Sequence, residues 1–375
     1  MSSQGFRLLA FLGFATCEIS WQVASIILRH YLGLGTTLPT WPLQRIIRLQ
    51  ITKSILRSIS TTRLATPLSL DPGTEGDRFC LLPAASRQLY KGPLRNDDIR
   101  PQTIGATWTP ERLDPSPGRP PVVVALHFHG GAYVLGNGRD ADTGFLAQNY
   151  LKWTGCTHVL TPQYRLATTP KGRFPAAAQD ALSAYMYLIH NLGIPSEQII
   201  VAGDSAGGNL VMALLRYISE YGTELGIPWP AAALLWSPWT SLASSRDPTS
   251  IRKSPNYATD YIHESFPIWG VEGLTGHGGV SFDDPYLSPG LEQSFTSLTP
   301  LWVHSGKLEL LYEDNRDFVT KFRANGTQVE WDVDEGCPHD IALMGEKLGF
   351  EKEAVQASRR AGDFLSNVLS KDKVT

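Results

Sequence analysis

One serine stands in a glycine-rich stretch, where residues 203–208 read Gly-Asp-Ser-Ala-Gly-Gly and the serine is Ser205. An apolar run precedes the stretch at residues 199–202, and a helix-like segment follows from Asn209. A G-x-S-x-G pattern between a strand and a helix places its serine in a sharp turn, with the hydroxyl exposed at the start of the helix. The same glycines could mark a helix start without chemistry or a phosphate cradle. The strand–turn–helix context favours a nucleophilic role for Ser205.

A second glycine pair follows another apolar run, in the sequence His-Gly-Gly-Ala-Tyr at residues 129–133. Glycine lets a backbone approach a reacting group closely, and N–H groups about 3 Å from a developing oxyanion stabilise it. We expect the N–H groups of Gly130, Gly131 and Ala206 to form such an oxyanion hole. Ala132 stands where a third glycine often occurs, and it still offers a backbone N–H.

A nucleophilic serine of this kind needs an acid and a histidine base, in the chain order serine, acid, histidine. Four histidines follow Ser205, namely His263, His277, His304 and His339. His339 lies in a loop after the last apolar run, where the base is expected, so we predict that it is the base. The histidines with a predicted structural role, in packing or in orienting the glycine loop, are His127, His129 and His304.

The acid is expected after the preceding apolar run, residues 301–304. Glu309 comes next and is our choice, with Glu313 and Asp314 as the alternatives. A carboxylate at this place would hold the imidazole in the correct tautomer and stabilise the imidazolium that forms. The predicted catalytic residues are therefore Ser205, Glu309 and His339.

These side chains must be positioned by strands that end close together, and the sequence predicts such strands. From residue 121 onward, short apolar runs alternate with helix-like segments. The runs cover residues 122–128, 158–164, 199–203, 231–236, 301–304 and 329–333. The helix-like segments lie near residues 140–152, 175–192, 207–221, 311–324 and 353–369. This alternation predicts an α/β fold, with a mostly parallel central sheet, helices on both faces and a helical cap.

Two helical patterns at the N-terminus precede this alternation. Residues 8–28 are apolar and long enough to span a bilayer, although Glu18 at their middle costs about 3 kcal/mol on insertion. A cap or interfacial helix, a membrane anchor and a signal peptide are the three interpretations of this segment. Residues 43–59 carry an isoleucine-rich stripe with basic residues off it. They predict a basic amphipathic helix, which could lie on a membrane surface or close over the active site.

Domain boundaries follow from these patterns. We expect an apolar N-terminal helix over residues 1–35 and a cap with lead-in strands over residues 36–110. The α/β catalytic domain is expected over residues 111–375. Residues 240–285 interrupt its alternation and are rich in Ser, Pro and Gly, so we predict that they form an insertion belonging to the cap.

Charge and composition argue against several classes of protein. The net charge is −3, although residues 19–70 carry six basic residues and no acidic one. A basic N-terminus thus precedes an acidic body, and nothing indicates a nucleic-acid partner. No group of side chains has metal-ligand spacing, so we expect no metal and no cofactor. The four cysteines show no C-x-x-C spacing and are predicted to be free thiols. We expect an intracellular protein, with membrane contact through the N-terminus, and nothing in the sequence sets its oligomeric state.

Several motifs occur together in the order typical of one family. They are residues 129–131, Tyr164-Arg165-Leu166-Ala167 with Phe174-Pro175-Ala176, residues 203–208, Ser237-Pro238-Trp239 and Asp284-Pro285-Tyr286-Leu287-Ser288-Pro289. Over roughly residues 120–345 the chain resembles the hormone-sensitive-lipase-like branch of α/β-hydrolases. The stretch 302–309, with Pro338-His339-Asp340, is similar to fungal members. Those include steryl-acetate hydrolases and hydrolases of secondary-metabolite gene clusters.

The resemblance implies an activity as well as a fold. It implies hydrolysis of a hydrophobic carboxylic ester with a short acyl group, through an acyl-enzyme, beneath a cap built from the N-terminal helices and the insertion. Acyl transfer or lactonisation with the same three residues is the alternative. The plant gibberellin receptor resembles this branch too, but its catalytic histidine position is substituted. The presence of His339, with Ser205 and Glu309, favours an enzyme over a small-molecule receptor of that kind.

Overall fold

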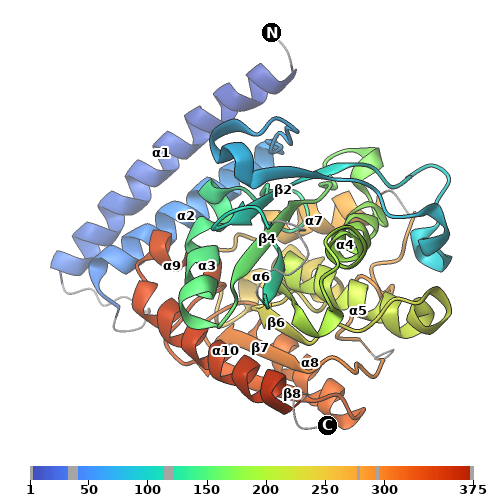
Figure 1. The fold of residues 1–375 in the computed structure, drawn as a ribbon. Helices are drawn as coiled ribbons and strands as arrows, with labels where there is room; N and C mark the ends of the chain where they lie inside the picture. Colours follow the sequence, from blue (N-terminus) through green and yellow to red (C-terminus); the bar gives the residue numbers. More distant parts are fainter. Residues whose placement is uncertain (1–2, 33–40, 114–120, 277–278, 292–294, 372–375) are drawn as a thin grey trace.

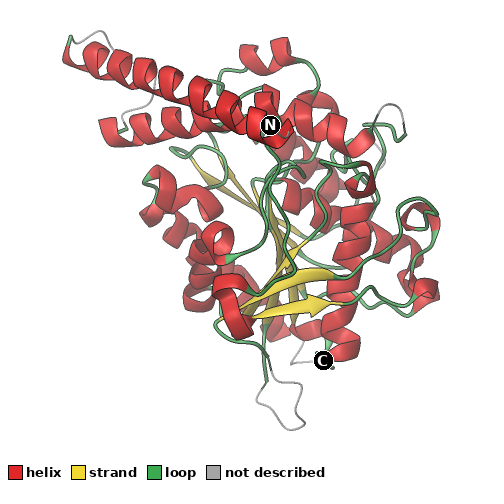
Figure 2. Ribbon diagram, turned by 90° about the horizontal axis from the view of Figure 1, so that it is seen from above, coloured by secondary structure: helices red, strands yellow, loops and turns green. Residues whose placement is uncertain are grey.

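The centre of the molecule is one eight-stranded sheet with helices on both faces (Figures 1 and 2). The structure is a computed structural model that describes residues 3–32, 41–113, 121–276, 279–291 and 295–371. The strands are β1 (Phe79–Leu82), β2 (Ile104–Thr109), β3 (Val124–Phe128), β4 (His158–Gln163), β5 (Ile199–Asp204), β6 (Ala232–Trp236), β7 (Leu301–Gly306) and β8 (Val329–Asp334). Their order across the sheet is β1-β2-β4-β3-β5-β6-β7-β8.

The strands from β3 to β8 run parallel, and only β1 and β2 run antiparallel to their neighbours. The four central strands, β3, β5, β6 and β7, are buried along their whole length. Burial on both faces explains why each of them reads as a continuous apolar run rather than an alternating one. The predicted α/β fold with a mostly parallel sheet is confirmed, and β1 and β2 are the strands that lead into it.

Ten α-helices surround the sheet in the described part of the chain. They are α1 (Ser3–Tyr31), α2 (Leu43–Thr62), α3 (Asp140–Trp153), α4 (Ala176–Met186), α5 (Ala206–Leu225), α6 (Pro248–Lys253), α7 (Ser265–Thr275), α8 (Tyr312–Ala324), α9 (Ile341–Leu348) and α10 (Glu351–Lys371). α3, α9 and α10 pack against one another, and α4 packs against α5. The segment predicted as an insertion lies between β6 and β7 and contains α6 and α7.

The two N-terminal helices pack against each other along one side of the molecule (Figure 1). α2 also contacts α7 and α9. Lys53 of α2 is buried, and its ammonium group donates to the carbonyl oxygens of Tyr257 and Asp260. The Ser60 hydroxyl lies 2.6 Å from that of Ser265 at the start of α7. Buried polar contacts therefore join α2 to the segment between β6 and β7.

Two basic side chains of α2, and Arg63 directly after it, pair with acidic residues of the protein itself. The ion pairs are Arg45–Glu353 at 2.8 Å, Arg57–Glu18 at 2.7 Å and Arg63–Glu272. Glu18, the charge that disfavours insertion of the first helix, is therefore balanced by Arg57. In the part of the chain that the structure describes, no helix has both the length and the apolar character needed to cross a membrane.

Candidate active site

Ser205 occupies the turn between β5 and α5. Its backbone has φ 49° and ψ −114°, a conformation that non-glycine residues seldom adopt and that is found mainly at functional sites. Its N–H donates to the carbonyl of Trp236 at 2.8 Å, and its carbonyl accepts the N–H of Trp239 at 2.9 Å. The end of β6 and the segment after it thus hold the strained turn in place.

Two glycines of the serine motif let α5 begin directly on the sheet. A Cβ at Gly207 would lie 1.8 Å from the carbonyl oxygen of Phe128 in β3. A Cβ at Gly203 would lie 2.3 Å from the carbonyl carbon of Gly207. Neither position has room for a side chain, which is the physical reason for the spacing that predicts the nucleophile.

The glycine loop after β3 turns through three successive residues at positive φ, Gly131 at 104°, Ala132 at 50° and Tyr133 at 61°. Tyr164 supports the start of this loop. Its hydroxyl donates to the carbonyl of His129 at 2.7 Å, and its ring stacks on the His129 imidazole at 4.2 Å between centroids. The contacts of His129 are those of a residue that orients the loop, as its sequence position suggested.

The three predicted oxyanion donors lie near Ser205, but one of them has a second partner. Gly130 and Gly131 line the same pocket as Ser205, and Ala206 follows it directly. Gly130 also lies against the carboxyl of Asp204, because a Cβ there would come within 2.2 Å of Oδ2, and its N–H stabilises that carboxylate. Ala132 lines a second pocket together with Ser205. Its backbone N–H is therefore a further candidate donor, as its place in the glycine loop indicated.

His339 and Glu309 come together beyond the ends of β8 and β7. Nδ1 of His339 lies 3.7 Å from Oε2 of Glu309. This distance exceeds that of a hydrogen bond, although such contacts are often long before substrate binds. Both side chains are buried, with 2% and 0% exposed. His339 also lines the pocket that contains Ser205, so the structure brings the three predicted catalytic residues to one place.

Three donors fix the carboxylate of Glu309. They are the Ser237 hydroxyl at 2.6 Å, the Asn315 side-chain amide at 3.1 Å and the Gly306 N–H at 3.2 Å. No catalytic pattern in the sequence predicts these roles for Ser237 or Asn315. Ser237 belongs to a motif that carried the family resemblance, and this was the only signal that could have identified it.

The two alternative acids have partners elsewhere. Glu313 pairs with Arg316 one turn along α8, at 2.5 Å. Asp314 accepts the Ser244 hydroxyl at 2.6 Å. Of these three acidic residues, Glu309 is therefore the one that lies beside His339.

The pKa of His339 is raised to about 9. Burial lowers this pKa, but the carboxylates of Glu309, Asp260 and Asp340 together outweigh the effect of burial. Asp260 is itself buried and accepts the N–H groups of Ile262 and Leu310. With no substrate bound, these carboxylates therefore favour the cationic form of His339.

His127 and His129, which precede Ser205 in the chain, are buried and have structural partners. Nε2 of His127 lies 2.9 Å from Oδ1 of Asp204. Burial lowers the pKa of His127 to about 3 and that of His129 to about 4. Downstream, Nδ1 of His263 lies 2.9 Å from the Ser265 hydroxyl, and His277 lies outside the described residues.

His304 belongs to the group of side chains in the described ranges that could hold a metal ion, together with Asp332 and Asp334. Its Nε2 lies 2.9 Å from Oδ2 of Asp334. The guanidinium of Arg360 binds both carboxylates at 2.7–2.9 Å. Arg360 thus supplies the positive charge there, and we assign no metal to this group.

A buried pair of carboxyl groups, absent from our sequence analysis, links the nucleophile turn to the histidine loop. Asp204 and Asp340 hydrogen-bond to each other. Burial raises the pKa of both carboxyl groups, so sharing a proton between them is favoured. Asp340 also caps α9 through the Leu343 N–H at 3.2 Å, and its own N–H donates to Ser237 at 3.0 Å.

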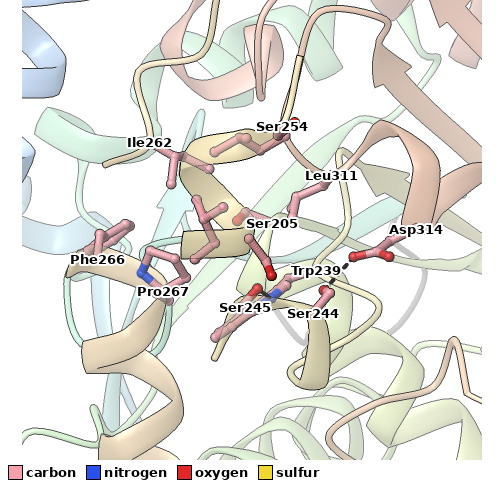
Figure 3. Close-up of a pocket in the computed structure, with 14 residues that line it drawn as sticks. Ser205, Trp239, Ser244, Ser245, Ser254, Ile262, Phe266, Pro267, Leu311 and Asp314 are labelled. Atoms are coloured by element: carbon pink, nitrogen blue, oxygen red, sulfur yellow. Dashed lines mark hydrogen bonds between the residues drawn. The ribbon is translucent and has the colours of Figure 1, made fainter. Parts of the chain in front are cut away.

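Two pockets meet at Ser205. The larger, of 280 Å³, is lined by α2, the glycine loop, His339 and α9. The smaller, of 170 Å³, is lined by residues between β6 and β7 and by the start of α8. Figure 3 shows the smaller pocket, with the Ser205 side chain among the residues that surround it. Ser205, Ile262 and Phe266 line both pockets.

A family model described as alpha/beta hydrolase fold matches residues 125–343. This chain belongs to that family. The matched range contains Ser205, Glu309 and His339, and the predicted resemblance to α/β-hydrolases is confirmed.

Two bacterial proteins are among the relatives of this chain. The chain is 31% identical to an acetyl-hydrolase of Streptomyces hygroscopicus over 211 residues, which are 55% of this chain and 64% of that protein. It is 30% identical to an ethyl acetate hydrolase of Pseudomonas putida over 226 residues, or 59% of this chain and 66% of that protein. Both matches therefore span slightly less than two thirds of the relative.

Solved structures agree with the family assignment. A hormone-sensitive lipase from a metagenome library superposes with a TM-score of 0.58 at 26% identity, over 71% of this chain and 82% of that one. An esterase of the bacterial hormone-sensitive lipase family gives a TM-score of 0.60 at 24% identity, over 94% and 98% of the two chains. The second likeness concerns the fold alone.

Proposed function

We propose that this protein hydrolyses carboxylic esters through an acyl-enzyme, with Ser205 as the nucleophile, His339 as the base and Glu309 as the acid. One observation carries the proposal. The strained Ser205 and His339 line a single pocket, and Glu309 lies 3.7 Å behind His339. The names of the two relatives, an acetyl-hydrolase and an ethyl acetate hydrolase, support an ester as the substrate.

The arrangement supplies each proton transfer that this reaction needs. Neutral His339 takes the proton of Ser205 as Oγ attacks the ester carbonyl carbon, and gives that proton to the alcohol oxygen as the C–O bond breaks. Water then enters, loses a proton to His339 and attacks the acyl-enzyme, and Ser205 regains its proton when the acid leaves. Glu309 keeps the imidazole oriented throughout and stabilises its cationic form.

The negative oxygen that forms in both half-reactions would be bound by backbone N–H groups. We assign this role to Gly130, Gly131 and Ala206, with Ala132 as a fourth donor. Because the Gly130 N–H also interacts with the Asp204 carboxylate, we expect the N–H groups of Gly131 and Ala206 to contribute more to stabilising the oxyanion. The N-terminus of α5 adds the positive end of its dipole at the same point.

The larger pocket supports a hydrophobic alcohol. Its lining includes Ile55, Leu56 and Ile59 of α2 and Leu343 and Met344 of α9. The predicted amphipathic helix would in this proposal cover the site, as part of a cap formed with the segment between β6 and β7. The resemblance of residues 302–309 to fungal hydrolases makes an ester intermediate of secondary metabolism our candidate for the natural substrate.

Ser205→Ala tests the proposal directly. The purified protein should hydrolyse p-nitrophenyl acetate or butyrate faster than long-chain esters. The variant should lose about 10³-fold or more in kcat, because the three residues act as a unit. Ser358→Ala, a buried serine of α10 that bonds only within its own helix, is the matched control. If Ser205→Ala kept most of the activity, the nucleophile would be a different residue.

We also propose that α1 contacts a lipid surface. Large apolar side chains at its C-terminal end are exposed, with Trp21 at 76%, Leu28 at 60% and Tyr31 at 81%. Contiguous apolar exposure of this kind is typical of interaction surfaces. Tryptophan and tyrosine are the residues that favour a membrane–water interface.

A further inference from the structure

The two pockets that meet at Ser205 differ in one respect that decides their roles. The larger contains His339, whereas the smaller does not and has Ala132 beside Ser205 instead. In ester hydrolysis the histidine must reach the alcohol oxygen to protonate it as it leaves. The alcohol therefore departs through the larger pocket, and the acyl group bonded to Ser205 occupies the smaller one.

The smaller pocket has the size of a short acyl chain. Its 170 Å³ offers roughly ten water-sized positions, which is enough for an acyl chain of six carbon atoms. Apolar side chains, among them Trp239, Ile262, Phe266 and Leu311, form much of its wall. A purely aliphatic acyl chain would need apolar contacts with these residues alone.

The remainder of the wall is polar. The polar side chains are Ser244, Ser245, Ser250, Ser254 and Asp314. Three of these hydroxyls already have partners in the protein. Ser245 accepts the indole N–H of Trp239 at 2.9 Å, Ser250 donates to Asp247 at 2.7 Å and Ser254 accepts the backbone N–H of Asn256 at 3.3 Å. The other two polar residues, Ser244 and Asp314, are bonded to each other.

One carboxylate oxygen of Asp314 can still accept a hydrogen bond. Its Oδ2 accepts the Ser244 hydroxyl at 2.6 Å, and no hydrogen bond of Oδ1 is recorded within the described residues. Figure 3 shows Asp314 and Ser244 pointing toward each other across the wall of the pocket. Asp314 is half-buried; partial burial raises its pKa, and the neighbouring Asp317 and Glu313 raise it further. A carboxyl in such a place gains from a ligand that donates to it.

We propose that the smaller pocket is the acyl site, and that Asp314, positioned by Ser244, selects acyl groups whose far end carries a hydrogen-bond donor. This inference rests on the proposed esterase function. The substrate class is then an ester of a short ω-hydroxy or ω-amino acid with a hydrophobic alcohol. The competing explanation is that Asp314 only stabilises α8, because it lies in the first turn of that helix.

The test compares three p-nitrophenyl esters, of hexanoic, 6-hydroxyhexanoic and 6-aminohexanoic acid, by kcat/KM. The wild-type protein should favour each donor-bearing ester over hexanoate by on the order of tenfold. Asp314→Leu should remove both preferences while hexanoate is still hydrolysed. Asp314→Asn separates hydrogen bonding from charge attraction. Its amide oxygen still accepts from the hydroxyl of the 6-hydroxyhexanoate, but it no longer attracts the ammonium group of the 6-aminohexanoate. Ser244→Ala should weaken both preferences.

Glu313→Gln is the matched control, because Glu313 lies in the same helical turn, pairs with Arg316 and does not line the pocket. It leaves Asp314 and Ser244 in place, so both preferences for the donor-bearing esters should persist. Equal kcat/KM values for the three esters in the wild-type protein, or preferences that survive Asp314→Leu, would overturn the inference. If Asp314→Leu does not fold, Asp314→Asn and Ser244→Ala decide. If Ser205→Ala abolishes the hydrolysis of hexanoate, the esterase proposal holds whatever the result for Asp314.

Discussion

Glu309 is the catalytic candidate whose assignment depends most on the fold, because other acidic residues follow closely in the chain. Glu309→Gln should lower kcat on p-nitrophenyl butyrate about 10³-fold or more, since an amide cannot stabilise the imidazolium of His339. The same change at Glu313 should have little effect, because Glu313 bonds to Arg316 at the surface. Equal and mild losses from the two variants would place the acid elsewhere.

The charge state of His339 makes a second prediction at this scale. Its pKa of about 9 means that the imidazole is cationic below that pH and cannot accept the Ser205 proton. The kcat/KM of the free enzyme should therefore rise with pH, about tenfold per unit from pH 7, and level off above pH 9. A stable ester such as ethyl butyrate, followed by titration of the released acid, gives the profile.

Asp260→Asn is the matching variant for this prediction. It removes one of the carboxylates that raise the pKa of His339, while an amide oxygen still accepts from the Ile262 N–H. The inflection should move to lower pH, and kcat/KM at pH 7 should rise relative to its plateau. An inflection near the ordinary histidine value of about 6.5 in the unmodified protein would show that the carboxylates do not act in this way.

That Ser205, His339 and Glu309 come together could be predicted because each has a local signature. Small residues flank Ser205, and His339 and Glu309 each follow an apolar run. Ser237 and Asp340 have no such signature, because their roles arise only where segments distant in the chain meet. The backbone N–H of Asp340 donates to the Ser237 hydroxyl, which in turn donates to Glu309. No spacing in the sequence predicts this chain of contacts.

At the scale of elements, the parallel strands were the most predictable part of the molecule. Strands buried on both faces give continuous apolar runs, and each predicted run from β3 to β8 lies within two residues of the observed strand at either end. The short helices were missed. α6 has six residues and α9 has eight, too few turns for a helical period to stand out from the surrounding loops.

The contact between α5 and β3 leads to a prediction about stability. Gly207→Ala should destabilise the protein by about 2 kcal/mol or more, because the new methyl group would meet the Phe128 carbonyl at 1.8 Å. Thermal unfolding followed by circular dichroism gives the difference. Gly226→Ala at the other end of α5 is the control, since nothing lies within 4 Å of its Cβ position. Its left-handed φ of 66° should cost about 1 kcal/mol. A Gly207 variant as stable as the control would contradict the close packing.

At the scale of the whole molecule, several basic residues near the N-terminus already have partners within the protein. Residues 19–70 carry only basic charges, yet Arg45, Arg57 and Arg63 each pair with an acidic residue of the protein. Lys53 is buried against backbone carbonyls, and burial lowers its pKa to about 8. Attraction of α2 to an anionic surface is therefore weakened by its internal partners. Apolar contact through α1 becomes the stronger basis for membrane association.

Deletions separate the roles of the two N-terminal helices. Removing residues 1–35 takes away α1 and its exposed apolar side chains, while α2 keeps its contacts with α7 and α9. The shortened protein should lose binding to phosphatidylserine vesicles in a sedimentation assay but keep most of its activity on p-nitrophenyl butyrate. Trp21→Ser with Leu28→Ser in the full chain should have the same effect on binding. Full-length protein that stays wholly in solution with vesicles at low salt would contradict the membrane proposal.

Removing residues 1–60 should have a different result. That deletion takes away Ile55, Leu56 and Ile59, which line the pocket with His339, and Lys53, which bonds to the segment between β6 and β7. The larger pocket would open to solvent and the cap would lose a buried anchor. We expect activity or folding to be lost, and circular dichroism distinguishes these two outcomes. A 1–60 deletion that is fully active would show that α2 covers the site without contributing to it.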